Sequence, residues 1–165
     1  MKDKIGGLKD GLIAELRATQ ECFERSSSCL TESDASFAPQ PGMLTVLQQL
    51  AHVPQTIDWF IDGIQSPQGF DLDFEKHWQD LAKCKTVADA RSWLGTAVAR
   101  AIEVVGSMSE AELRSPLPEG PVMGGDPKLA VVGAIADHTA HHRGALTVYS
   151  RLLGKAPKMP YLAEA

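Results

Sequence analysis

The chain of 165 residues contains few cysteines, and they form no recognisable pattern. Cys22, Cys29 and Cys84 are odd in number and include no C-x-x-C motif, so a disulfide framework is not predicted. Reduced thiols of this kind are typical of the cytoplasm, and we expect a cytoplasmic location.

Long apolar runs and clusters of basic residues are also missing. No segment approaches the roughly 18 apolar residues of a membrane-spanning helix, and residues 1–6 lack the apolar core of a signal peptide. The 16 lysines and arginines are scattered, and 21 aspartates and glutamates outnumber them, for a formal net charge of −5. We therefore expect neither a nucleic-acid partner nor a membrane partner.

The sequence shows no strand pattern, glycine-rich phosphate loop, nucleophile motif or internal repeat. Its content of 44% hydrophobic and 22% charged residues is that of an ordinary globular protein. At this length the simplest organisation is a single domain over residues 1–165.

Helical periodicity with clear start signals is what the sequence does contain. Capping residues such as Thr45 and Thr86 precede apolar stripes. Four long amphipathic helices are predicted, over residues 8–29, 45–64, 86–106 and 127–153. These features predict an all-α four-helix bundle of antiparallel-packed helices, with a short extra helix near 71–83 in a long crossover segment.

The short helix is predicted to lie over the bundle. Its apolar positions recur at helical spacing and are Phe70, Phe74, Trp78 and Leu81. His77 falls outside this stripe, so we interpret it as a solvated surface residue whose replacement by alanine should change nothing.

The last helix has the strongest end signals. Asp126 can cap its first turn, Pro127 suits the first helical position, and Gly154 can close it. The predicted buried seam follows alternating steps of four and three: Val131, Ile135, His138, His142, Ala145, Tyr149 and Leu152.

Two of these seam positions are histidines. Because His138 and His142 are four residues apart, both imidazoles lie on one helical face and can share a metal ion. The alternative is a pair of hydrogen-bonded core histidines.

A third histidine, His52, belongs to the second helix, which is apolar nearly all round. Periodicity places His52 on a semi-polar strip with Gln48, Gln49, Gln55, Thr56 and Trp59. That strip could line a polar cavity or face solvent, and periodicity leaves both possibilities open.

Several motifs, taken together, resemble those of the DinB family of metalloenzymes. They are Leu50-Ala51-His52, Asp137-His138-x-x-His141-His142-Arg143-Gly144, and Tyr149-x-Arg151-x-x-Gly154-Lys155-x-Pro157. The resemblance implies a four-helix bundle, often a homodimer, in which His52, His138 and His142 hold one divalent metal. His141 then lies outside the triad, although an i, i+3 pair with His138 is geometrically possible.

The resemblance also implies a function. Characterised relatives include thiol-dependent S-transferases, so metal-assisted transfer to a small-molecule substrate, with a low-molecular-weight thiol as cosubstrate, is the leading hypothesis. Three imidazoles with an open position suit Zn, Ni or Fe. The alternatives are a metal-dependent hydrolase, for which only Asp137 is a nearby carboxylate, and a non-catalytic, stress-associated metal-binding protein. Ala145, where the family often has glutamine, slightly favours the non-catalytic alternative.

Ligand imidazoles normally donate their second N–H to another group. We expect glutamine or backbone partners for these histidines, and the candidates on the second helix are Gln48, Gln49, Gln55 and Thr56.

Overall fold

The computed structural model describes residues 6–162 of the chain, and residues 1–5, which belong to the segment predicted to lack a signal peptide, lie outside that range. The elements within it are α1 (Leu8–Ser27), η1 (Glu32–Asp34), α2 (Val46–Gln65), α3 (Phe74–Leu81), α4 (Val87–Ser107), α5 (Glu110–Arg114) and α6 (Ala130–Leu152). The described residues form no strand, only an isolated bridge between Pro116 and Pro127. The all-α prediction is confirmed. No helix in the described range has both the length and the hydropathy that a membrane crossing requires.

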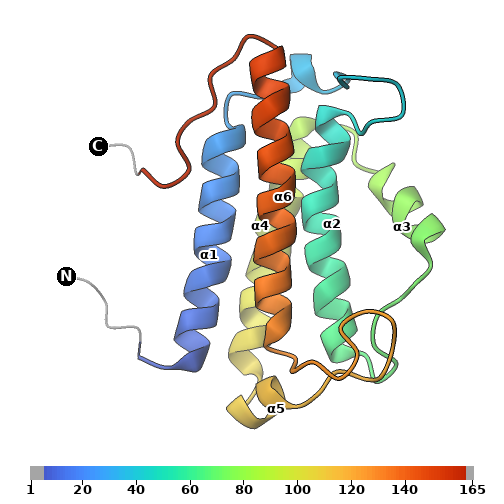
Figure 1. The fold of residues 1–165 in the computed structure, drawn as a ribbon, viewed down its shortest axis with the longest axis vertical. Helices are drawn as coiled ribbons and strands as arrows, with labels where there is room; N and C mark the ends of the chain where they lie inside the picture. Colours follow the sequence, from blue (N-terminus) through green and yellow to red (C-terminus); the bar gives the residue numbers. More distant parts are fainter. Residues whose placement is uncertain (1–5, 163–165) are drawn as a thin grey trace.

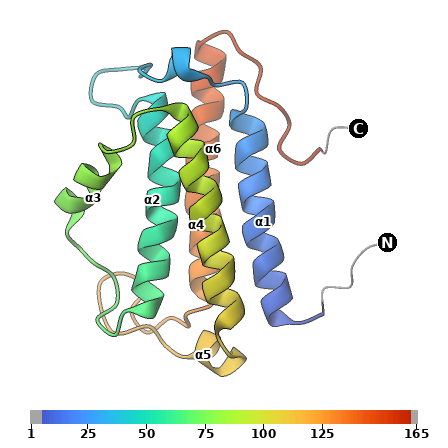
Figure 2. The same cartoon turned by 180° about the vertical axis from the view of Figure 1, so that it is seen from behind.

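The four long helices α1, α2, α4 and α6 form a bundle (Figure 1). α1 packs against α4 and α6, and α2 packs against the same two helices. The view from behind shows α4 between α1 and α2, on the opposite side from α6 (Figure 2). The bundle and its short helix in the crossover segment are as predicted.

The predicted helix directions are only partly right. α1 and α6 run in one direction and α2 and α4 in the other, so the neighbouring pairs α1·α6 and α2·α4 are parallel (Figures 1 and 2). The physical reason is the crossover of residues 66–86, which is long enough to carry the chain back along the bundle before α4 begins.

The interior of the bundle is filled by aliphatic side chains from all four long helices. The largest fully buried ones include Leu16, Ile57, Leu94 and Ile135. Leu146 is buried in α6, whereas the predicted seam residue Leu152 is 61% exposed. An α-helix has about 3.6 residues per turn, whereas the predicted seam repeats every 3.5 residues on average, so the buried face moves by about one residue over several turns.

The predicted start of the last helix was three residues too early. α6 begins at Ala130 after Leu129, and no side chain caps it. The amides of Lys128 and Leu129 instead donate to the carbonyls of Ser115 and Leu113, and Asp126 accepts from Leu117. These non-local hydrogen bonds, rather than the local capping signal, therefore determine where α6 begins.

The short helix α3 is also smaller than predicted, and its apolar stripe is not buried along its length. Leu81 is buried, but Phe74 is 56% and Trp78 49% exposed. α3 lies outside the bundle beside α2 (Figure 1), and these two rings form part of a pocket described below.

Candidate metal centre

Three histidines from two helices converge in the structure. One ring nitrogen each of His52, His138 and His142 lies within 4.8 Å of the others. The Nε2 atoms of His138 and His142 are 3.1 Å apart, a separation that fits two ligands bound to one ion at about 2.0–2.1 Å. Periodicity placed the pair in α6 correctly, and the open question about His52 is answered, because it lines a cavity and is half-buried.

A hydrogen-bonded chain fixes the tautomer of His142. The Tyr149 hydroxyl donates to the Leu44 carbonyl at 3.0 Å, and the Gln49 amide nitrogen donates to the Tyr149 oxygen at 3.4 Å. The Gln49 carbonyl oxygen is thereby directed at His142 Nδ1, which must donate a proton to it. Nε2 of His142 is then the nitrogen with a lone pair, and it faces the other two rings.

His52 is oriented in a similar way by its own helix. Its Nδ1–H donates to the Gln55 side-chain oxygen at 3.0 Å, and the Thr56 hydroxyl lies 3.5 Å from the same nitrogen. Of the predicted polar partners, Gln49, Gln55 and Thr56 contact the histidines. Gln48 does not, because its side chain accepts from the Thr45 backbone amide in the capping box of α2.

The cluster keeps its imidazoles neutral. Burial lowers the pKa of His138 to about 4, and the nearby His52 adds to the effect. Burial also lowers the pKa of His142 to about 3, with further contributions from His138 and His52. The pKa of His52 falls for the same first reason, burial, against the opposing hydrogen bond to Gln55. Neutral imidazoles are the form that binds a metal ion, so the residues present fit such an ion.

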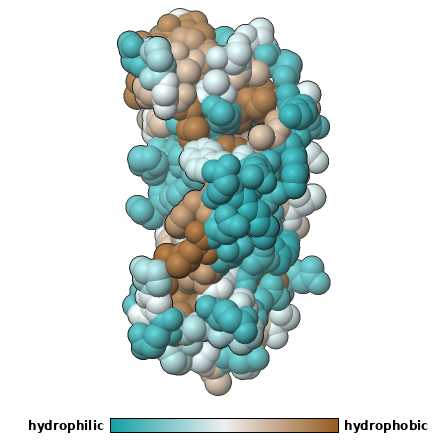
Figure 3. All heavy atoms as spheres, turned by 90° about the vertical axis from the view of Figure 1, so that its right-hand side faces the viewer, coloured by the Kyte–Doolittle hydropathy of each residue, from teal (hydrophilic) through white to brown (hydrophobic). Residues whose placement is uncertain are grey.

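A pocket of about 250 Å³ opens onto His52 and His138. Its walls are four aromatic side chains: Trp59, Phe60, Phe74 and Trp78. The Trp78 indole stacks on the His52 imidazole, with ring centroids 5.9 Å apart and an angle of 15° between the planes. On the molecular face where α3 lies, a hydrophobic strip runs beside the hydrophilic residues that cover its centre (Figure 3). α3 supplies one wall of the pocket through Phe74 and Trp78.

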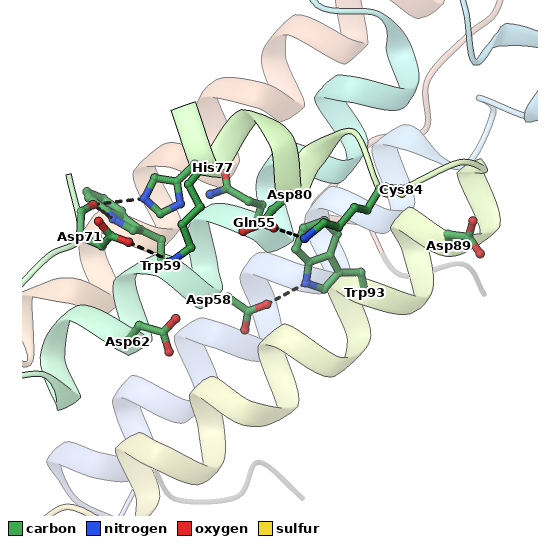
Figure 4. A pocket seen from close by; sticks show the side chains of 12 residues that line it. Gln55, Asp58, Trp59, Asp62, Asp71, His77, Asp80, Cys84, Asp89 and Trp93 are labelled. Carbon is green, nitrogen blue, oxygen red and sulfur yellow. Dashed lines mark hydrogen bonds and ion pairs between the residues drawn. The ribbon is translucent and has the colours of Figure 1, made fainter. Parts of the chain in front are cut away.

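The prediction that His77 is a solvated surface residue is wrong. It is half-buried and lines this pocket, because α3 turns its side chain toward Trp59 on α2. The carbonyl of Asp71 accepts from His77 Nε2 at 3.2 Å and from Trp59 Nε1 at 2.6 Å (Figure 4). The loop before α3 therefore fixes both rings, and Nδ1 of His77 retains its lone pair.

Two other candidate residues lie outside the cluster. His141 is exposed, and its ring contacts His142 edge-on with centroids 5.0 Å apart. Asp137 is exposed as well, as its place before a seam position predicted. The sequence pattern assigned Tyr149 only to the apolar seam and missed its role in orienting His142. The available signal was that a buried tyrosine needs a partner for its hydroxyl.

Fold and site together define a class: a four-helix bundle whose second and last long helices bring three histidines together, two of which line an aromatic pocket. The chain belongs to the DinB superfamily, whose family model matches residues 15–146, as the sequence motifs predicted. No curated protein matches it.

Solved structures share this fold. YfiT from Bacillus subtilis, described as a probable metal-dependent hydrolase with an unusual four-helix bundle topology, is 18% identical with a TM-score of 0.70, over 94% of this chain and 93% of YfiT. A DinB-like protein from Bacillus cereus is 15% identical with a TM-score of 0.72, over 93% and 97%. A mycothiol-dependent maleylpyruvate isomerase is 13% identical with a TM-score of 0.69, over 88% of this chain and 63% of the isomerase.

Proposed function

We propose that the chain is a metal-dependent enzyme in which His52, His138 and His142 hold one divalent ion, Zn, Ni or Fe, with a coordination position open toward the pocket. The observation that carries this proposal is the pair of glutamines, Gln49 and Gln55, that accept from Nδ1 of two of the rings. Each bond leaves Nε2 as the metal-binding nitrogen. A bound ion would act as a Lewis acid and would lower the pKa of a thiol or water beside it.

The reaction that we favour is S-transfer from a low-molecular-weight thiol to a small-molecule electrophile. DinB superfamily membership and the fold shared with a mycothiol-dependent isomerase support this choice. The lining of the pocket supports it too, because none of its described residues is a carboxylate that could serve as a general base for water. The aromatic walls would exclude water from the reacting atoms.

The second candidate is a metal-dependent hydrolase, favoured by one observation. His77 lines the pocket and keeps Nδ1 free to accept a proton, since its Nε2–H donates to the Asp71 carbonyl. A third possibility, a non-catalytic metal-binding protein, is tied to Ala145 in place of the usual glutamine.

Metal analysis of protein purified without a histidine tag is the first test. We expect about one divalent ion per chain in the wild type and in His141→Gln, and a metal-free His138→Gln. Consumption of thiols by a panel of small electrophiles, against hydrolysis of a panel of esters and amides, then separates the two enzyme candidates. A metal-free wild type would refute both of them.

Assembly and location remain proposals as well. We propose a homodimer formed through exposed apolar residues of the helices or of the Phe70–Leu81 segment, where Leu72, Phe74 and Trp78 are exposed. The three free cysteines are consistent with a cytoplasmic location. Sedimentation that shows a monomer at micromolar concentration would contradict the proposed homodimer.

A further inference from the structure

We infer that the pocket selects a substrate group that is apolar, flat and free of negative charge apart from its metal-binding atom. This inference rests on the proposed function and names the substrate class of that same site. Its basis is that charged side chains line one of two adjoining pockets and are absent from the described lining of the other.

The first pocket, which opens onto His52 and His138, is walled mainly by aromatic side chains. Trp59 and Phe60 come from α2, and Phe74 and Trp78 come from α3. Apart from histidine, none of its described lining residues is ionisable. A planar ring between such walls gains stacking and loses water-exposed apolar area. A carboxylate there that did not bind the ion would be desolvated and would meet no cationic side chain.

The second pocket, of about 510 Å³, adjoins the first and shares Gln55, Trp59 and His77 with it. Five aspartates line it: Asp58, Asp62, Asp71, Asp80 and Asp89 (Figure 4). These carboxylates lie beyond the shared wall, so an anionic group that projected from the first pocket would approach negative charge.

The cations in and beside the second pocket offset this charge only in part, because three cations, Lys76, Lys83 and Arg100, face five aspartates and each of the three is already paired. Lys76 lies 3.2 Å from Asp71, and Lys83 lies 2.5 Å from Asp80. Arg100, on α4, pairs with Asp58 and Asp62. A substrate carboxylate would have to displace one of these partners to gain an ion pair.

The thiol or thiolate that binds the ion is the exception. Its charge is located at the metal position and is balanced by the ion, whereas charge elsewhere on the molecule is not. Discrimination therefore acts on the remote part of the ligand rather than on its donor atom.

A matched set of thiols tests this inference on Co²⁺-loaded protein, with binding followed by the cobalt absorption bands. The probes are phenylmethanethiol, 4-(mercaptomethyl)benzoate and the methyl ester of that benzoate, which controls for size. We expect the carboxylate to bind at least about tenfold more weakly than its ester. Trp78→Ala should weaken phenylmethanethiol about tenfold, whereas Tyr161→Ala, which removes an aromatic ring that is 72% exposed outside the pocket, should not.

The outcomes separate the two proposals. If cobalt binds but carboxylate and ester have equal affinity, or Trp78→Ala has no effect, the substrate class is wrong and the metal site stands. If no cobalt binds, the proposed function fails; quenching of tryptophan fluorescence by the same probes in the metal-free protein then tests the pocket alone. Equal quenching by the ester and the carboxylate would overturn the inference there too.

Discussion

Acid should destabilise the metal-free protein well above the pH at which carboxylates titrate. In the folded state burial holds the pKa of His138 at about 4 and that of His142 at about 3. The unfolded chain takes up protons near the ordinary value of 6.5. The pKa values of both imidazoles are lower in the folded state than in the unfolded state. The two neutral imidazoles therefore make their full contribution to stability above about pH 6.5, and this contribution is lost as the pH falls toward 4.

The size of the effect follows from the same shifts. Each pH unit below 6.5 costs about 1.4 kcal/mol for a group that stays neutral only in the folded state. At pH 5 this amounts to about 2 kcal/mol for the buried His142. Solvent screens the half-buried His138 and reduces its share, so we expect a combined loss of about 3 kcal/mol. That is a large part of the 5–15 kcal/mol typical of a domain.

Urea unfolding of chelator-treated protein at pH 8, 6.5 and 5 measures this loss as a fall in the transition midpoint at constant m-value. His138→Gln should lose less stability than the wild type over this range, whereas His141→Gln should lose as much. Equal midpoints at pH 8 and pH 5 would refute the reasoning. So would an unchanged loss in a variant that lacks both imidazoles.

Three further changes are predicted. His142→Ala should empty the metal site and leave a cavity, while His141→Ala should cost far less metal by elemental analysis; the reverse result would make the i, i+3 pair the true site. Gln49→Leu should weaken metal binding about 10–100-fold in a competition titration with a chelator, because the His142 tautomer is no longer fixed, and an unchanged affinity would contradict this role. Thr139→Val should raise the free energy of unfolding by about 1 kcal/mol, since the Thr139 hydroxyl is buried without a partner in the described structure; a loss of stability would indicate a partner such as water.

The helix boundaries that the sequence predicted well are those set by local chemistry. α2 begins at Val46 after the Thr45 capping box and α4 at Val87 after Thr86, each within one residue of the prediction. Such boxes consist of groups three residues apart and need no tertiary contact. Thr31 and Asp34 form a similar capping box at η1, a short helix that the predicted elements do not include. The predicted start of α6 is wrong because the amides of Lys128 and Leu129, just before the helix, donate to carbonyls 13 and 16 residues away along the chain.

The three histidines were predictable to different degrees. His138 and His142 occupy positions where the period of α6 requires inward side chains, so periodicity alone pairs them. His52 lies on a helix that is apolar nearly all round, and only the family motif singled it out. His77 and Trp78 were misjudged because amphipathic reasoning assumes that a helix turns its apolar stripe to the core. α3 instead stands beside α2 and encloses a cavity, an arrangement that depends on the crossover.

The contacts that pack α2 against α6 include the hydrogen bonds that orient the site. The chain that fixes His142 starts at the Leu44 carbonyl, just before α2, passes through Tyr149 on α6 and returns to Gln49 on α2. A shift of α6 by one residue in sequence, which turns its side chains by about 100° around the helix axis, would break this chain and would also turn the apolar residues of α6 away from the core. The contacts that stabilise the bundle therefore set the tautomer and direction of the imidazole, and the site needs no flexible loop to assemble it.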